Sequence, residues 1–92
     1  MPGTITPRAA TTQVLRPPVG VPVMAMAECL PTETVVGGGV RMETTDPRDL
    51  SRFHMLEGGP TATGWVGQGA AIQGFAQGSS LILTTTVYCL AP

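Results

Sequence analysis

The sequence predicts a small all-β domain, an antiparallel β-sandwich or barrel, with an extended Pro-rich arm at its N-terminus. Three observations predict this fold class. Gly and Pro together make up 21 of the 92 residues, a share that disfavours long helices. Thr and Val, which favour strands, are frequent. No window carries apolar residues at the spacing of a helix face over enough length to predict a helix.

The chain begins with a segment that offers little to bury. Residues Met1 to Pro18 contain four prolines among Thr, Ala and Gly, a composition that favours extended or polyproline conformations. We therefore predict an arm over residues 1–18 and a sandwich domain over residues 19–92. The arm is expected to bind a neighbouring subunit through its few adhesive side chains, which are Ile5, Arg8, Val14, Leu15 and Arg16.

Five strands are predicted in the domain. From Val19 to Cys29 the odd positions are apolar or small, as in a strand with one buried face, and Pro22 indicates an edge strand. The last strand has the clearest pattern, because its odd positions carry Leu81, Leu83, Thr85, Val87 and Cys89. The other predicted strands span Thr34–Glu43, Ser51–Glu57 and Trp65–Gln73, with a mixed-charge loop over Glu43–Arg52.

The two cysteines both fall on inward-facing stripes of predicted strands. Cys29 and Cys89 either form a bridge or remain two buried thiols, and we favour the bridge. It would close a loop of about 60 residues and contribute about 4 kcal/mol in the chain-entropy model. Catalytic or metal-binding roles are not expected, since no CxxC motif or second ligand pair accompanies them.

Gly37-Gly38-Gly39 lies inside a predicted strand and lacks the Gly-Lys-Ser/Thr sequence of a phosphate-binding loop. It indicates a bulge, or close approach of the backbone to a large side chain such as Trp65. Trp65 is the only tryptophan, and we predict that it anchors the core rather than an exposed ligand site.

The sequence contains no recognisable catalytic motif. Asp46, Asp49, Ser51 and His54 are the only residues that could supply an acid, a base and a nucleophile together, and their spacing matches no known set. We expect no enzyme activity and no cofactor. The net charge of −1 disfavours nucleic-acid binding, and no segment has the roughly 20 apolar residues of a membrane span.

The residues from Cys29 to Cys89 resemble a small β-sandwich domain of actinobacterial surface proteins and some of their phages. The matching residues are Cys29, Val35–Gly39, Pro60-Thr61, Gly64-Trp65 and Thr84–Cys89. Tyr88 directly precedes Cys89, whereas that pattern has a residue or two between them. The resemblance implies a disulfide-containing sandwich that is exposed outside the cell, and it implies no catalytic residues.

Two functions remain open at this point. The first is a capsid decoration or cement protein of a bacteriophage, made in the host cytoplasm and bound to the major capsid protein or neighbouring virion subunits. The second is a bacterial cell-surface adhesion or glycan-binding module. The small size favours the first, as do Pro18 and Pro22, which interrupt the one stretch that resembles a secretion signal. The low charged fraction of 12% also predicts self-association, with a trimer favoured.

Overall fold

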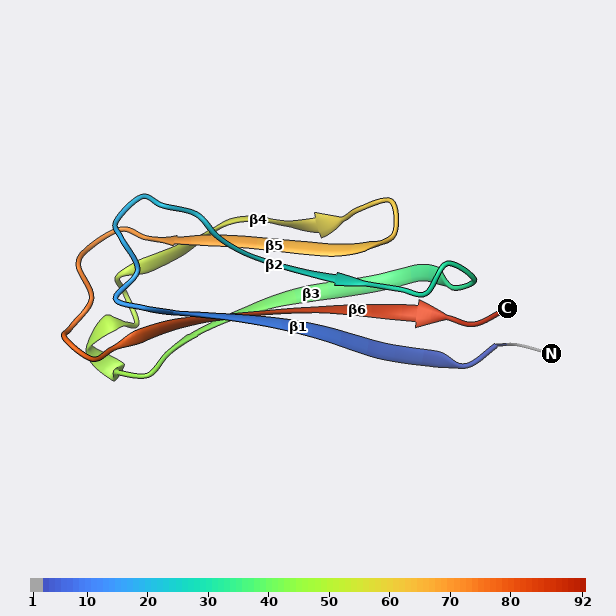
Figure 1. The fold of residues 1–92 in the computed structure, drawn as a ribbon, viewed down its shortest axis with the longest axis horizontal. Helices are drawn as coiled ribbons and strands as arrows, with labels where there is room; N and C mark the ends of the chain where they lie inside the picture. The colour runs from blue at the N-terminus through green and yellow to red at the C-terminus, as the bar shows by residue number, and fades with distance from the viewer. Residues whose placement is uncertain (1–2) are drawn as a thin grey trace.

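The structure, a computed structural model, describes residues 3–92. Across these residues the chain forms strands joined by turns and one short 3-10 helix, and no helix is long and apolar enough to cross a membrane (Figure 1). The elements are β1 (Ile5–Leu15), β2 (Val23–Glu28), β3 (Thr34–Thr44), η1 (Pro47–Asp49), β4 (Phe53–Pro60), β5 (Gly64–Ala71) and β6 (Ser80–Leu90). The predicted all-β class is confirmed.

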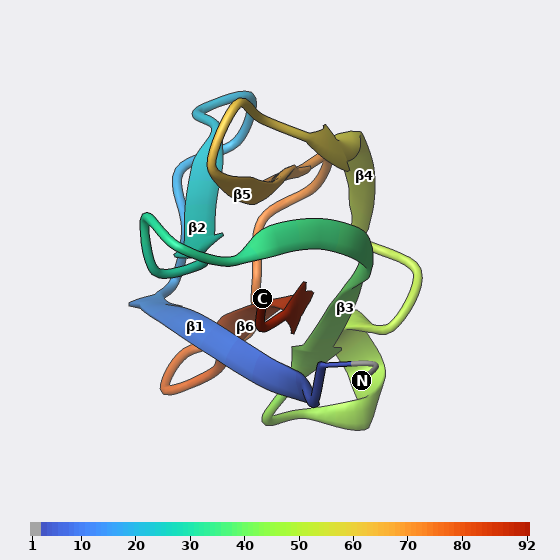
Figure 2. The same cartoon turned by 90° about the vertical axis from the view of Figure 1, so that its right-hand side faces the viewer.

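The strands form two antiparallel sheets that pack face to face. The first sheet has the order β1-β6-β3 and the second has the order β2-β5-β4. The view along the long axis shows β2, β5 and β4 lying over β1, β6 and β3 (Figure 2). The molecule is elongated, with extents of 51 × 19 × 16 Å, because the strands of the first sheet run along its length. The predicted antiparallel sandwich is therefore confirmed.

The core lies between the central strands of the two sheets. Every residue of the predicted β6 stripe is fully buried: Leu81, Leu83, Thr85, Val87 and Cys89. They face Val23, Ala25 and Ala27 of β2, which are 4–6% exposed. The Thr85 hydroxyl donates to the carbonyl of Ala25 at 2.9 Å, so this buried polar group is satisfied. Period-two alternation thus places both stripes on the same inner face.

Most predicted strand positions are confirmed, with small shifts at their ends. The largest shift is in β2, which begins at Val23 rather than Val19. Val19 and Val21 lie in the preceding turn, where Gly20 adopts φ +80°, and they are 56% and 50% exposed. β2 is an edge strand of the second sheet, as Pro22 indicates.

The predicted N-terminal arm is not confirmed. Met1 and Pro2 lie outside the described residues, but Ile5–Leu15 forms β1 and pairs with β6 over its whole length, from Ile5 opposite Leu90 to Leu15 opposite Ser80. Inward and outward residues alternate along β1, and Val14 packs against the core. The edge position explains why a strand can contain Pro7. The segment is therefore an integral strand of the sandwich.

Candidate functional site

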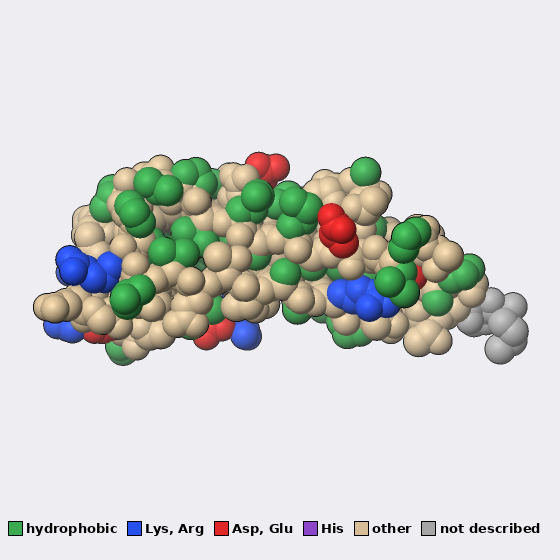
Figure 3. All heavy atoms as spheres, in the orientation of Figure 1, with side chains coloured by type: hydrophobic (Ala, Val, Ile, Leu, Met, Phe, Trp, Pro, Cys, Tyr) green, Lys and Arg blue, Asp and Glu red, His purple; other side chains and the backbone are tan. Residues whose placement is uncertain are grey.

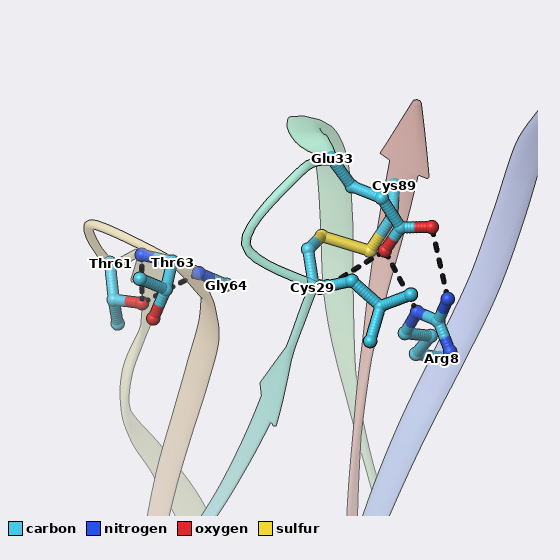
Figure 4. Close-up of a disulfide and its surroundings, with 8 residues drawn as sticks. Arg8, Cys29, Glu33, Thr61, Thr63, Gly64 and Cys89 are labelled. Carbon is cyan, nitrogen blue, oxygen red and sulfur yellow. Dashed lines mark hydrogen bonds and ion pairs between the residues drawn. A yellow bond between two sulfur atoms is a disulfide. The ribbon is translucent and has the colours of Figure 1, made fainter. Parts of the chain in front are cut away.

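The Cys29–Cys89 disulfide joins the two sheets at one end of the sandwich. Cys29 follows β2 in the second sheet and Cys89 lies on β6 in the first, 60 residues further along the chain. The predicted bridge is confirmed (Figure 4). The Cys29 backbone N–H also donates to the carbonyl of Thr63 at 2.8 Å, which attaches the β4–β5 hairpin to the same end.

A bidentate ion pair lies beside the bridge. Arg8 of β1 donates from Nε to Glu33 Oε1 at 3.1 Å and from Nη2 to Glu33 Oε2 at 2.9 Å (Figure 4). Glu33 also accepts from the Leu30 N–H at 2.8 Å, and its side chain is only 6% exposed. These hydrogen bonds lower the pKa of Glu33 below its ordinary value, and the bond from Arg8 has the largest effect. Arg8, predicted to bind a neighbouring subunit, is therefore occupied within the chain.

One group of possible metal ligands occurs among the described residues. A sulfur or carboxylate atom from each of Cys29, Glu33 and Cys89 lies within 4.8 Å of the others. Both sulfurs are used in the disulfide, so neither is a thiolate, and metals bind the thiolate. The carboxylate is engaged by Arg8. The group therefore acts as a structural junction of β1, β6 and the β2–β3 turn.

The four residues considered as a catalytic set are not assembled into one. Asp46 accepts from Arg48, which lowers the pKa of that carboxyl to about 2. Asp49 is fully buried and accepts from Arg52 Nη1 at 3.2 Å and from the Ala76 N–H at 3.3 Å. His54 lies exposed on β4. At the other end of the sandwich, Asp46 thus caps η1 within its own loop, while Asp49 joins that loop to the β5–β6 loop. The absence of enzyme activity stays an expectation.

Trp65 packs on the core cluster beside the disulfide. It is partly buried against Ala27, Val87 and Cys89. Gly38 of β3 lies directly under its ring, because a Cβ at that position would overlap two ring carbons of Trp65. The close backbone approach predicted for the glycine run is therefore confirmed at Gly38, and the pairing of β3 with β6 also shifts register just before Gly37, as expected of a bulge.

The other side chains assigned to the predicted arm are distributed along β1 and just after it. Ile5 and Leu15, at its two ends, are 56% and 64% exposed. Val14 packs into the core, and the Arg16 N–H donates to the carbonyl of Ser79 at 2.8 Å. Ile5 and Leu15 thus remain available to a partner, while Val14 has a role inside the domain. Contact with a neighbouring subunit stays a prediction.

The outer surface is apolar and nearly neutral, and it is the broadest candidate for a functional surface. Four of the five arginines form ion pairs with acidic side chains of the same chain. The space-filling view shows hydrophobic side chains spread along the length of one face, among polar side chains and backbone, with charged groups at several places between them (Figure 3). The large hydrophobic residues that are at least 42% exposed are Ile5, Leu15, Val19, Val21, Met24, Met26, Leu30, Val36, Leu50, Met55, Leu56, Ile72 and Tyr88.

One part of this surface forms a row that the sequence analysis missed. Met24 and Met26 lie on the outer side of β2, between the inward positions, and are 48% and 44% exposed. Val66 of β5 is directly opposite Met26, which places it on the same outer face. We call Met24, Met26 and Val66 the methionine row. The sequence does contain a sign of this row: Met24 and Met26 occupy even positions between the inward-facing residues, where a strand face exposed to solvent usually has polar residues.

A hollow of about 380 Å³ lies on the outer face of the first sheet. It is lined by Gly38, Gly39, Val40, Arg41, Thr84, Thr86 and Tyr88 of β3 and β6. A second hollow, of about 350 Å³, lies between the β2–β3 turn and the β4–β5 hairpin. From the sequence, the glycine run indicated a bulge or close approach to a large side chain such as Trp65, and nothing in the sequence associated it with Tyr88.

Comparison with protein-family models, with curated proteins and with solved structures finds no match to this chain. The disulfide and the small β domain implied by the resemblance to actinobacterial and phage sandwich domains are both present. Membership of that family is not confirmed.

Proposed function

We propose that this chain is a structural protein that covers the surface of a larger protein assembly, as a capsid decoration or cement protein of a bacteriophage does. In this proposal it is made in the host cytoplasm and becomes part of the virion surface. Its partners are the major capsid protein or neighbouring virion subunits, and it binds neither nucleic acid nor membrane.

The observation that carries the proposal is the apolar and charge-compensated surface. A small domain that acts alone usually keeps its surface charged to remain soluble. Here four of the five arginines are paired with acidic side chains of the same chain, while Met24 and Met26 of the methionine row are left exposed. Met adapts its shape to a partner and is enriched at protein interfaces, whereas Lys and Glu are depleted there.

The arrangement of the fold supports the same proposal. The disulfide, the bidentate pair of Arg8 and Glu33 and the Trp65 cluster all stabilise one end of a narrow sandwich. Such a rigid body loses little conformational entropy when it binds, which favours a permanent structural role. An unpaired basic surface, which a nucleic-acid-binding protein needs, is not formed by the described arginines.

Rebinding to particles tests the proposal and the surface together. Particles of the virus that encodes the chain would be stripped of it and mixed with the purified full chain, and bound protein would be measured after sedimentation. We expect saturable binding by the wild type and a loss of roughly tenfold or more in affinity for Met26→Arg, which buries an unpaired charge. Gln13→Arg is the matched control, because Gln13 is exposed on β1 of the other sheet.

Two different results would contradict the proposal at two levels. If the wild type does not bind stripped particles at any concentration, the structural role is wrong. If the wild type binds but Met26→Arg binds equally well, the methionine row is not the contact surface.

A further inference from the structure

Gly38 and Gly39 of β3 differ in whether the surrounding structure leaves room for a side chain. Gly38 is needed because any side chain there would overlap Trp65. At Gly39, by contrast, an added Cβ would meet no atom within 4 Å, and the backbone is not left-handed, unlike Gly20 and Gly78. Glycine in a strand interior is destabilising relative to alanine. The internal structure therefore gives no reason for glycine at position 39.

The bare backbone at Gly39 forms the floor of the outer hollow. Gly39 pairs with Thr86, and Arg41 pairs with Thr84, so these four residues share the outward face of the first sheet. Tyr88 is 44% exposed and stands opposite Gly37 at the side of the same hollow. Glycine in a strand often marks a position where a ligand approaches the backbone closely. The volume of about 380 Å³ is in the range of small-molecule sites.

The charges around the hollow restrict the chemistry of a ligand. Arg41 Nε lies 2.8 Å from Glu43 Oε1, and Glu43 is on the same face of β3. The guanidinium is therefore compensated, and the hollow offers no net positive charge for a phosphate or carboxylate. Its lining offers the Thr86 hydroxyl, further guanidinium donors of Arg41 and the aromatic ring of Tyr88. It also offers the Thr84 hydroxyl, which lies 3.3 Å from the Thr11 hydroxyl, while the Glu43 carboxylate lies beside Arg41 outside the lining. This set matches a neutral molecule that carries many hydroxyl groups on an apolar ring frame.

We propose that this hollow binds a neutral sugar unit of a glycan. The sugar ring lies over the Gly39 backbone with one face against the Tyr88 ring, while its hydroxyls bond to Thr84, Thr86 and Arg41. The site is on the first sheet, whereas the methionine row is on the second. The two surfaces can thus be used together, and the sugar site does not depend on the proposed virion role.

A titration of the isotope-labelled full chain, followed by its amide NMR spectrum, tests the site. The probes are the methyl glycosides of glucose, galactose, mannose, N-acetylglucosamine and rhamnose, with inorganic phosphate and glucuronic acid as charged probes. We expect at least one neutral glycoside to shift the amides of β3 and β6 around the hollow. The two charged probes are expected to leave those amides unchanged, since the arginine is already compensated.

Gly39→Val separates binding from folding. Valine fills the hollow, but its Cβ has open space and valine favours strands, so the melting temperature should equal or exceed that of the wild type. Gly59→Val is the matched control, because a Cβ at Gly59 of β4 also meets no atom within 4 Å. We expect Gly39→Val to abolish sugar binding and Gly59→Val to preserve it. Tyr88→Leu, which keeps the strand but removes the ring, should weaken binding roughly tenfold.

The proposal is overturned if no neutral glycoside shifts the outer amides of the first sheet, or if Gly39→Val binds sugar as the wild type does. Loss of sugar binding with intact particle binding in Gly39→Val would support the sugar site alone. If Gly39→Val unfolds, Tyr88→Leu and Gly59→Val still test the site. Equal sugar affinity in those two variants would show that the hollow is not the sugar-binding site.

Discussion

Removing the Cys29–Cys89 bridge should destabilise the domain by a large fraction of its total stability. The bridge spans 60 residues and joins the two sheets, so it restricts most of the unfolded chain. The chain-entropy model gives a contribution of about 4 kcal/mol for a loop of this length. Small domains unfold with about 5–15 kcal/mol in total. We therefore expect the reduced protein to melt on the order of 20 °C lower than the oxidised protein.

Urea unfolding followed by tryptophan fluorescence measures this directly, since Trp65 is the only tryptophan and packs beside the bridge. Oxidised and reduced wild type differ only in the bond, so their comparison isolates the cross-link. A Cys29→Ala, Cys89→Ala variant adds the loss of packing, because Cys89 is fully buried. If reduction lowers the free energy of unfolding by less than about 1 kcal/mol, the bridge is not the main support of this fold.

Four further predictions follow from the packing, the charges and the surface. Gly38→Ala should lower the free energy of unfolding by about 1–3 kcal/mol because its methyl group overlaps Trp65, whereas Gly39→Ala should be neutral or stabilising, and equal effects in urea unfolding would contradict this. The pKa of Asp46 is lowered from 3.8 to about 2, and the pKa of Glu33 is also lowered. Each ionised carboxylate therefore stabilises the fold at pH values above its ordinary pKa, and this stabilisation is lost as the pH falls through the pKa in the folded state. Unfolding measured between about pH 4 and 2 should show this loss, and Glu33→Gln should reduce it. Removal of residues 1–18 deletes β1 and uncovers the edge of β6, so the truncated chain should lose cooperative thermal unfolding, and a sharp transition near the full-length temperature would refute the role of β1. The full chain should sediment as an oligomer, with a trimer expected, and a monomer at all concentrations would exclude self-association.

The strongest parts of the fold were predictable because they depend on local alternation. In β6 the inward positions are large and apolar, and their period of two identifies both the strand and its buried face. The same reasoning placed Cys29 and Cys89 on inner faces, from which the bridge followed. The edge position predicted for β2 is confirmed, although Pro22, on which the prediction rested, lies just before the strand and outside its hydrogen-bonded ladder.

β1 could not be predicted because its alternation is carried by small or polar residues. Ala10, Thr12 and Val14 face inward, but Ala and Thr do not stand out from the neighbouring exposed residues Ala9 and Thr11. A composition rich in proline then favoured an arm. The pairing with β6 over the whole segment makes it a strand.

The sheet order and the outer hollow depend on pairing between distant segments. Of the consecutive strands, only β4 and β5 pair with each other, so neighbours in sequence say little about neighbours in space. Gly39 and Thr86 become partners solely through the pairing of β3 with β6. The Arg8 and Glu33 pair likewise requires β1 to lie beside β6.

Quantitative mass spectrometry of purified particles tests the proposed role at the virion surface most directly. Particles of the encoding virus would be passed through successive density gradients, and the molar ratio of this chain to the major shell protein would be measured at each step. We expect the ratio to stay constant and brief surface labelling of intact particles to modify this chain. A ratio that falls toward zero with each gradient, with the chain recovered only in the soluble fraction, would contradict it.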